Sequence, residues 1–401
     1  MPQSPSREKP FIVSRMSPAR LATSLFASSF ATQNGVAGRP TVAASAPGRV
    51  NLIGDHTDYN GGPVLPVALE RRTAIAARAA GRWAFVSDTE NVVREIDIDA
   101  PMRHAWTDYL VGVVRELRVL RAAPPGAELA VATNLPIGAG LSSSAALTVA
   151  AAKALSLLAG KRLSAAALAE VAFRAEYHQV GVRCGRMDQT IAAQGERGSA
   201  LLFETADGSI HPVPLPGRLW IVETGISHRL TGGALNERRR ECEEALGFCQ
   251  EWRRGLIYLA QLSVGDLPEV ERRLPPPLVP RVRHVVNETA RTRTAADALA
   301  AGNLPALGRL LVQGHESLRV DFESTTPEAD LIVRSAVEHG AYGARLTGAG
   351  WGGAVVVLAP PDREARTVAE LGRDFQKQFG RLPTTWSSRA SRGVRRETIP
   401  Q

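Results

Sequence analysis

The run GRVNLIGDHTDYNGG, residues 48–62, is dense in side chains that can do chemistry. Six of them carry a charge or a strong hydrogen-bonding group: Arg49, Asn51, Asp55, His56, Asp58 and Asn60. Such groups bind hydroxyls, move protons and neutralise phosphate charge. The run offers little that a hydrophobic core could bury. It therefore predicts a ligand-binding or catalytic site rather than a purely structural segment.

A second run, LPIGAGLSSSAAL (residues 135–147), predicts a phosphate site. Gly138 and Gly140 favour a tight turn, and an alanine- and leucine-rich helix follows at once. Free N–H groups and the dipole at such a helix start bind anions without a lysine, and residues 49–152 contain none. Three serines after the turn are suited to capping the helix, to donating hydroxyls or to binding Mg²⁺. A plain capped helix is the alternative, although capping needs only one serine.

A third run, TGAGWGG (residues 347–353), lies between two apolar segments. Alone, it is typical of a tight hairpin or a bulge. Beside a phosphate loop it is also suited to form a wall that lets the backbone approach a ligand closely.

In this order, the three runs resemble the three motifs of the GHMP kinase superfamily, and the first closely resembles the galactokinase signature. The segment CGRMDQ (residues 184–189) resembles a further family motif, in which an aliphatic residue usually stands at the position of Arg186. The resemblance extends from Ala19 to the last predicted strand. It implies an α+β fold of two domains, with the site between them. The N-terminal domain would be of the ribosomal protein S5 domain 2-like type and the C-terminal domain ferredoxin-like.

The resemblance also implies roles for matching residues. Asp188 would be the catalytic base facing the anomeric hydroxyl, and Arg49 would keep Asp188 ionised and steady the charge on the transferring phosphoryl group. Ser144 and Glu176 would bind Mg²⁺. The residues implied to bind the sugar are Asp55, His56, Thr57, Asp58, Gly185 and Leu235. Those implied to bind the phosphates of ATP are Gly138, Ala139, Gly140, Leu141, Ser142, Ser143 and Ser144.

Structural alternatives stand beside two of these roles. Asp188 could be a helix N-cap with a structural arginine partner, and Glu176 could be a surface carboxylate on a helix.

Two sugar-side positions depart from the galactokinase pattern. Asp55 stands where the family usually has Glu, and it is one methylene shorter. Leu235 precedes an NERR stretch where the family usually has Tyr, and leucine cannot hydrogen-bond a sugar. Since apolar contacts discriminate between substrates far less than paired polar groups do, we expect either relaxed stringency or a related substrate such as an N-acylated or deoxygenated galactose.

The predicted function is that of an ATP-dependent kinase, foremost a galactokinase, which phosphorylates the anomeric hydroxyl of galactose. A kinase for a galactose derivative such as N-acetylgalactosamine is the first alternative. A non-catalytic sensor of sugar and ATP is a second, against which stand Ala145 and Ala146 after the serines and the presence of Asp188. A nucleic-acid-binding protein is a third, suggested only by the net charge of +8, because the basic residues are scattered and form no block.

Composition frames these expectations. The chain has 401 residues, of which 44% are hydrophobic and 22% charged, as is typical of a globular protein of two domains. Three cysteines without a CxxC pair favour a reduced, cytoplasmic protein. No apolar run reaches the roughly 18 residues of a membrane helix, so we expect no membrane partner, and we expect a monomer.

The predicted divisions are a flexible extension (1–18), for which a transit peptide is the alternative, an N-terminal domain (19–210) and a C-terminal domain (211–401). Pro and Gly cluster near the boundary, in the turn-rich segment 206–217. Helices are predicted at 19–33, 107–123, directly after the serines, 164–180, 233–252, 279–302, 304–320 and 362–380. Strands are predicted at 41–47, 64–79, 82–88, 93–99, 127–136, 198–204, 218–224, on both sides of the third glycine run, and at 384–390. In the first half the alternation of apolar and polar residues predicts a sheet with one wet face.

Overall fold

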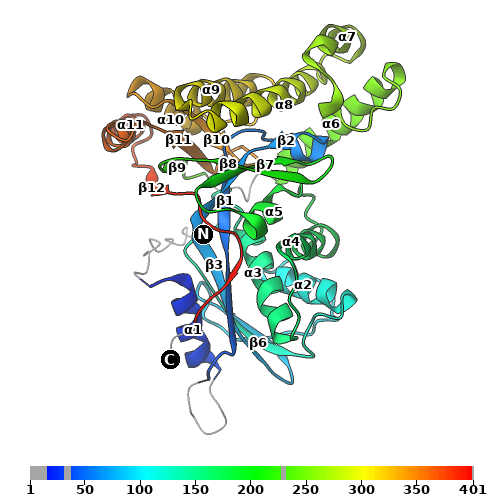
Figure 1. Ribbon diagram of the computed structural model, residues 1–401, viewed down its shortest axis with the longest axis vertical. Coiled ribbons are helices and arrows are strands. Elements are labelled where there is room, and N and C mark those ends of the chain that lie inside the picture. Colours follow the sequence, from blue (N-terminus) through cyan, green and yellow to red (C-terminus); the bar gives the residue numbers. More distant parts are fainter. Residues whose placement is uncertain (1–15, 31–37, 227–231, 400–401) are drawn as a thin grey trace, which may run out of the picture.

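The computed structural model describes residues 16–30, 38–226 and 232–399, and two sheet-and-helix units make up its lower and upper parts in Figure 1. Long strands of the lower sheet run up to the upper unit. From one edge to the other, the hydrogen-bonded strands of the first sheet are β13-β1-β3-β6-β4-β5, and those of the second sheet are β10-β11-β9-β12. A third sheet, β2-β7-β8, lies near the junction of the two units. Mixed sheets with helices packed on them confirm the predicted α+β class.

The first sheet is antiparallel except where β4 and β6 run parallel. Its strands are β1 (Val42–Asn51), β3 (Pro66–Ala79), β4 (Trp83–Ser87), β5 (Arg94–Glu95), β6 (Ala127–Thr133) and β13 (Arg395–Arg396). One face packs on four helices, which are α2 (Thr107–Val119), α3 (Ser143–Leu158), α4 (Ala165–Arg174) and α5 (Met187–Gln194). A π-helical segment, Ala175–Val180, continues directly from α4. Helix α3 begins at a predicted site residue, Ser143, and α5 carries another, Asp188, in its first turn.

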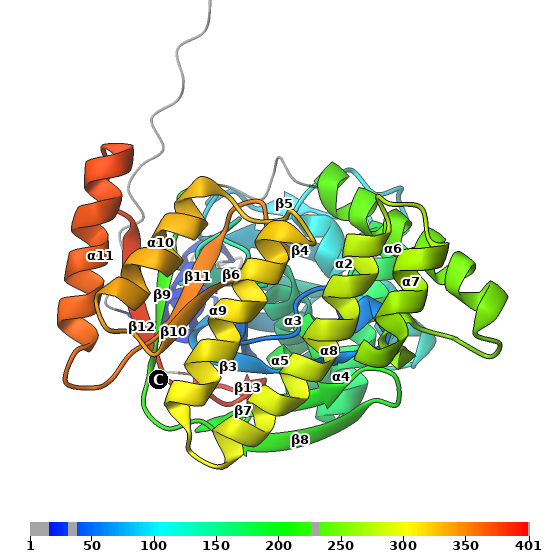
Figure 2. The ribbon, with the colours of Figure 1, turned by 90° about the horizontal axis from the view of Figure 1, so that it is seen from above.

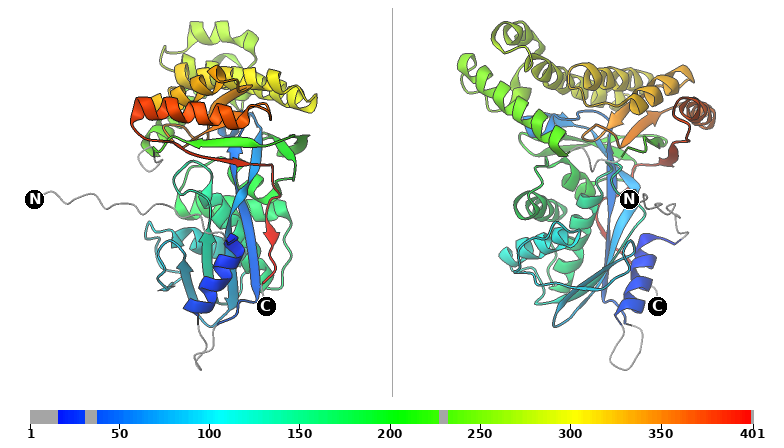
Figure 3. Two further views of the ribbon diagram at one scale, coloured as in Figure 1. Left: turned by 90° about the vertical axis from the view of Figure 1, so that its left-hand side faces the viewer. Right: turned by 180° about the vertical axis from the view of Figure 1, so that it is seen from behind.

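The prediction of one wet face is wrong, because α1 (Pro18–Ser29) covers the other side of this sheet. Figure 3 shows α1 against the sheet, on the side away from α2 and α3. Phe26 and Leu25 pack on alanines of β3 and β6, such as Ala76 and Ala130. Small apolar residues alternate with large ones along these strands, so a dry face with small side chains resembled a wet one in the sequence.

The second unit has a wholly antiparallel sheet with most of its helices in one layer. Figure 2, seen from above, shows α8 and α9 side by side across this layer. Its strands are β9 (Leu219–Glu223), β10 (Gly343–Thr347), β11 (Ala354–Leu358) and β12 (Thr384–Ser388). Its helices are α6 (Gly232–Trp252), α7 (Leu267–Arg273), α8 (Val279–Ala300), α9 (Leu304–Val320), α10 (Pro327–Glu338) and α11 (Glu364–Phe379).

The chain returns to the first unit at its end. After β12, the backbone N–H of Ser391 donates to Ala68 and that of Gly393 to Gly195, and β13 then pairs with β1. The buried Arg72 side chain donates to the carbonyls of Arg392 and Gly393 at 2.8 and 2.7 Å. The last residues therefore brace the strand that carries Arg49.

Several predicted elements differ from the observed ones. The turn-rich segment 206–217 contains β8 (Ser209–Pro214), paired with β7 (Ser199–Glu204), which in turn pairs with β2 (Pro63–Val64). Helices α7 and α10 were not predicted, and the strand predicted at 93–99 shrinks to two residues. The helix predicted at 164–180 changes from α to π at Ala175. Residues 31–33 of the first predicted helix lie outside the described ranges.

Most of the predicted extension, residues 1–15, also lies outside the described ranges, whereas Ser17 caps α1 through its hydroxyl. Across the described ranges, no helix is both long enough and apolar enough to cross a membrane.

Candidate active site

The centre of the site is an ion pair between Arg49 on β1 and Asp188 in the first turn of α5. Arg49 Nε lies 2.7 Å from Asp188 Oδ1, and Nη2 lies 2.9 Å from Oδ2. The third Arg49 nitrogen, Nη1, donates to the carbonyl of Gly140 at 2.5 Å. Arg49 is buried, while the Asp188 side chain keeps 25% of its surface exposed. The arginine thus joins the first two sequence motifs, and the carboxylate remains accessible.

Asp188 does not cap its helix. Arg186 occupies the N-cap position of α5, and no side chain caps that helix. The N-cap alternative for Asp188 is therefore wrong. Instead, its Oδ2 accepts a second hydrogen bond, from Ser142 Oγ at 2.5 Å. Bidentate pairing with a buried arginine and a bond from a hydroxyl therefore hold both carboxylate oxygens in place.

The second motif forms a turn that leaves the start of α3 open. Gly138 and Gly140 have φ values of 78° and 70°, and Ser142 also adopts a left-handed conformation with φ 58°. Ser142 is the N-cap residue of α3, but its hydroxyl makes no cap hydrogen bond, so the alternative of a plain serine-capped helix is wrong. The first N–H groups of α3 therefore lack a side-chain acceptor, which is the arrangement that binds anions.

Glu176 lies inside the fold rather than on its surface, so the surface-carboxylate alternative is wrong. It is 2% exposed, and its Oε1 accepts from Thr148 Oγ1 at 3.0 Å and Gln189 Nε2 at 2.9 Å. Burial raises its pKa to about 7, against hydrogen bonds from Gln189, Ser144 and Thr148 that lower it. The π-helical turn carries Glu176, and such turns often mark functional sites.

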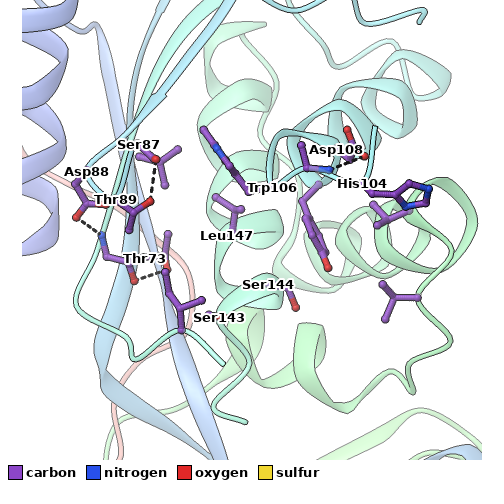
Figure 4. A pocket seen from close by; sticks show the side chains of 17 residues that line it. Thr73, Ser87, Asp88, Thr89, His104, Trp106, Asp108, Ser143, Ser144 and Leu147 are labelled. Carbon is purple, nitrogen blue, oxygen red and sulfur yellow. Dashed lines mark hydrogen bonds between the residues drawn. The ribbon is translucent and has the colours of Figure 1, made fainter. Parts of the chain in front are cut away.

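A large cavity of about 510 Å³ opens beside the serines of α3 (Figure 4). Trp106 and Leu147 line it with apolar surface, while Ser143, Ser144 and Thr89 add hydroxyl groups. Apart from the serines, the sequence did not predict this lining, which also includes Thr73, Ser87, Asp88, His104, Tyr109 and Val182. An aromatic pair, Trp106 and Tyr109, at the start of α2 was the signal available.

A second cavity, of about 100 Å³, lies at Arg49 and Asp188. The first and third motifs, the CGRMDQ segment and α6 contribute to it. Its lining is Arg49, Asp55, His56, Asp58, Tyr59, Arg183, Cys184, Gly185, Met187, Asp188, Leu235, Arg239, Gly348 and Ala349. The structure thus brings together five of the six residues expected on the sugar side. The sixth, Thr57, is fully buried, and its hydroxyl donates to the carbonyls of Gly54 and Pro63.

Asp55 is almost fully engaged by protein groups. Its Oδ1 accepts from Asn51 Nδ2 and from the backbone N–H of Gly348, both at 3.1 Å, and its Oδ2 lies 2.8 Å from Arg345 Nη2. Burial raises the pKa of Asp55 to about 6, although Arg345 and Asn51 oppose the shift. The shortened carboxylate therefore ties the first motif to the third, in addition to lining the cavity.

Arg345 holds a second buried carboxylate. Its Nη1 lies 2.6 Å from Oε1 of Glu288, which also accepts from the Gly54 backbone N–H. Arg345 and Glu288 are both fully buried. Burial raises the pKa of Glu288, but Arg345 and Arg291 outweigh it and bring that pKa to about 2. Sequence reasoning missed this pair, for which the only signal was an arginine within the apolar strand GARLT.

His56 and Asp58 are held by different means. His56 has φ 66° and stacks on Phe322 at 4.2 Å between ring centroids, with Nδ1 3.0 Å from the Tyr59 hydroxyl. Burial lowers its pKa well below the usual value, so the imidazole is neutral. Burial, and then the nearby Asp188, raise the pKa of Asp58 to about 6.

Gly185 makes room for Asp58. A Cβ atom at Gly185 would lie 1.6 Å from Asp58 Oδ2, a distance no real contact allows. The glycine of the CGRMDQ segment is therefore a requirement of close approach.

Across the described residues, no group of three or more His, Cys, Asp or Glu side chains could hold a metal ion. Ser144 and Glu176 together offer one hydroxyl and one carboxylate, which are hard oxygen donors.

Comparisons with known proteins agree with this geometry. Residues 28–79 match the galactokinase galactose-binding signature, residues 108–196 the GHMP kinase N-terminal domain and residues 295–377 the GHMP kinase C-terminal domain. The galactokinase of Chloroflexus aggregans is 40% identical over 88% of this chain and 93% of its own length. That of Chloroflexus aurantiacus is 41% identical over 85% and 90%, respectively.

Among solved structures, that of Lactococcus lactis galactokinase complexed with galactose superposes with a TM-score of 0.87 at 29% identity. The match covers 93% of this chain and 98% of that one. A mevalonate kinase superposes with a TM-score of 0.63 at 18% identity, covering 87% of this chain and 99% of that one, and shares the fold.

Proposed function

The chain belongs to the galactokinase family of GHMP kinases, and on that premise we propose that it transfers the γ-phosphoryl group of ATP to the anomeric hydroxyl of galactose. The observation that carries the proposal is the position of the Arg49–Asp188 pair. It lines the small cavity, while its partner Gly140 belongs to the loop before α3, and the serines of α3 line the large one. A donor and an acceptor bound in the two cavities would meet at this pair.

In this proposal the large cavity holds ATP. Trp106 and Leu147 offer apolar surface to a nucleobase, and the open start of α3 offers N–H groups to the phosphates. The proposed phosphate-binding residues remain those from Gly138 to Ser144. Ser142 differs from the others, because its hydroxyl is bonded to Asp188 and only its backbone is free to contact a phosphate.

Asp188 would take the proton of the anomeric hydroxyl. Of the three carboxylates that line the small cavity, it is the one that is both ion-paired and accessible. Arg49 would hold Asp188 in its charged form and, beside the phosphate loop, offset charge on the transferring group. Ser142 would orient the second carboxylate oxygen.

We further propose Mg²⁺ as cofactor, bound by Ser144 and Glu176. Their hydroxyl and carboxylate oxygens suit this ion, which typically takes one or two protein ligands along with phosphates and water. A bound Mg²⁺ would neutralise phosphate charge. The buried carboxylate with its raised pKa supports the assignment, because a cation would relieve the cost of ionising it.

Asp55, His56, Asp58, Gly185 and Leu235 would surround the sugar. Thr57 would act only by shaping the loop, through its hydrogen bonds to Gly54 and Pro63. Leu235, in the wall of the small cavity, favours a relaxed preference or a galactose derivative as the second candidate substrate.

Three free cysteines in the described residues and the use of ATP support a cytoplasmic location, and we propose a monomer with no nucleic-acid partner.

An assay of ADP release across a sugar panel tests the function. Galactose, N-acetylgalactosamine and deoxygalactoses would be compared at saturating ATP, with the Asp188→Asn variant as the inactive control. Turnover of galactose or of one derivative is the expected result. Binding of both ligands without ADP release from any sugar would instead identify a sensor.

A further inference from the structure

Three consecutive arginines, at positions 238–240, are the seventh to ninth residues of α6. Their side chains lie in three different environments. Arg238 pairs with Glu241 and Glu323 and donates to the carbonyl of Phe322. Arg240 is exposed and pairs with Glu244. Arg239, between them, lines the small cavity together with Leu235. Since Leu235 and Arg239 are four residues apart on one helix, they share a face.

Arg239 is held in position, and its charge partly offsets the raised pKa of the nearby Asp58. Its guanidinium lies 4.6 Å from the centre of the Tyr59 ring, and its Nη1 donates to the Arg183 carbonyl at 2.8 Å. Its Nε is buried without a hydrogen-bond partner. Among the described residues, no carboxylate lies within ion-pair distance of it. A guanidinium has five N–H groups, so this one retains donors beyond the single bond it makes.

The helix that carries Arg239 is anchored on its other side. Glu241 lies 3.0 Å from Arg238 and 2.7 Å from Arg281 of α8, and Arg281 also pairs with Glu323. This ion-pair cluster fixes the start of α6 against α8 and against the segment after α9. A donor on the opposite face of α6 is therefore held in place rather than free to swing into solvent.

We propose that Arg239 is a substrate-binding, specificity-determining residue whose guanidinium donates to an acceptor oxygen of the sugar. It supplies, one helical turn further on, the polar contact that Leu235 cannot make. An arginine can only donate, so it selects for an oxygen on the sugar and discriminates against the analogue that lacks it. The inference deepens the proposed sugar phosphorylation and rests on it.

The test is a substrate–variant cycle with galactose and its 2-, 3-, 4- and 6-deoxy analogues, on the wild type, Arg239→Gln and Arg239→Lys. Arg240→Gln is the matched control, because it removes a neighbouring arginine of the same helix that does not line the cavity. We expect Arg239→Gln to raise the KM for galactose about 10- to 100-fold, the range for a charged hydrogen bond. The KM for ATP should stay unchanged.

The decisive result is the coupling. One deoxy analogue, poor with the wild type, should be no poorer than galactose with Arg239→Gln, because the hydroxyl and its donor form one contact. Arg239→Lys should lose the same coupling, since an ammonium group does not reproduce the planar donor set. Unchanged penalties for all four analogues in both variants would overturn the inference and leave Arg239 as a support for Arg183 and Tyr59.

Sugar-induced shifts of the unfolding temperature, measured without ATP, give the same cycle if turnover is too slow to follow. A wild type that binds galactose but releases no ADP would refute the proposed function while leaving the Arg239 inference open to this binding cycle. If the Arg239→Gln protein does not fold, the Arg239→Lys variant, which keeps the charge, decides whether the coupling is lost.

Discussion

Two cavities, one lined by the Arg49–Asp188 pair and the other by the serines of α3, differ in size and in chemistry. The larger, of about 510 Å³, is lined mainly by aromatic, aliphatic and hydroxyl groups, with Asp88, Asp108 and His104 among them, and the open start of α3 borders it. The smaller, of about 100 Å³, is lined by six charged side chains. Behind it, Arg345 pairs with one of these side chains, Asp55, and with a further buried carboxylate, Glu288.

On the proposed function, this difference predicts how each cavity would select its ligand. Apolar surface and backbone N–H groups tolerate variation, so the larger cavity would select by shape and by phosphate charge. Buried charges leave an unpaired partner behind when a ligand group is missing, so the smaller cavity would select the sugar hydroxyl by hydroxyl. Side-chain substitutions should therefore cost more on the smaller side.

The largest effect is expected at the junction of the cavities. Asp188→Asn keeps the size of the side chain but removes the proposed base, so kcat should fall about 10²- to 10⁴-fold with little change in the KM for ATP. ADP release measures this, with the exposed Asp207→Asn as control. Activity within threefold of the wild type would mean that Asp188 is not the base.

The next effect concerns the wall behind the smaller cavity. Arg345→Met should cost about 3–5 kcal/mol of unfolding free energy, because it leaves Asp55 and Glu288 buried without their shared cation. Arg319→Met, which breaks an exposed pair with Glu316, should cost about 0–1 kcal/mol. Denaturant unfolding compares the two variants, and equal losses would show that burial of the charges is unimportant.

Leu235→Tyr should sharpen the smaller cavity. A tyrosine hydroxyl adds a polar contact, so the ratio of kcat/KM for galactose over N-acylated or deoxygenated analogues should rise about 10- to 100-fold. If the wild type already prefers galactose strongly and the substitution leaves the ratio unaltered, the idea of relaxed or altered specificity fails.

The smallest effect concerns Glu176, behind the serines of the larger cavity. Its pKa is about 7 in the fold and 4.5 as the ordinary value, so the folded state holds an extra proton between these pH values. The contribution of Glu176 to the free energy of unfolding is therefore fully present below pH 4.5 and is lost as the pH rises through 7. Without ligands, Glu176→Gln should flatten this fall, by about 2–4 °C in unfolding temperature between pH 5 and 7.5. An identical slope in both proteins would place the Glu176 pKa elsewhere.

Much of the site could be predicted because its polar residues are contiguous in sequence. The motif residues Arg49 and Asp188 are 139 positions apart, yet the runs that carry them singled out both, and the structure places them in contact. Leu235, Gly185 and Asp58 likewise meet in one cavity.

What could not be predicted depends on long-range packing. Arg345 reaches Asp55 and Glu288 across elements that only the tertiary fold brings together. The sequence shows three equivalent arginines at 238–240, and only the phase of α6 against its neighbours turns one of them into the cavity. The packing of α1 on the first sheet could not be predicted for the same reason, because its partners are small alanines spread over three strands.

The proposed transfer to the anomeric hydroxyl is tested most directly by the position of the phosphate in the product. Phosphorus and proton NMR of the reaction of ATP with galactose should show one new phosphate, coupled to the proton on the anomeric carbon, and none with Asp188→Asn. A phosphate on any other carbon, or no sugar phosphate with galactose or its derivatives, would contradict the proposed role of the Arg49–Asp188 pair.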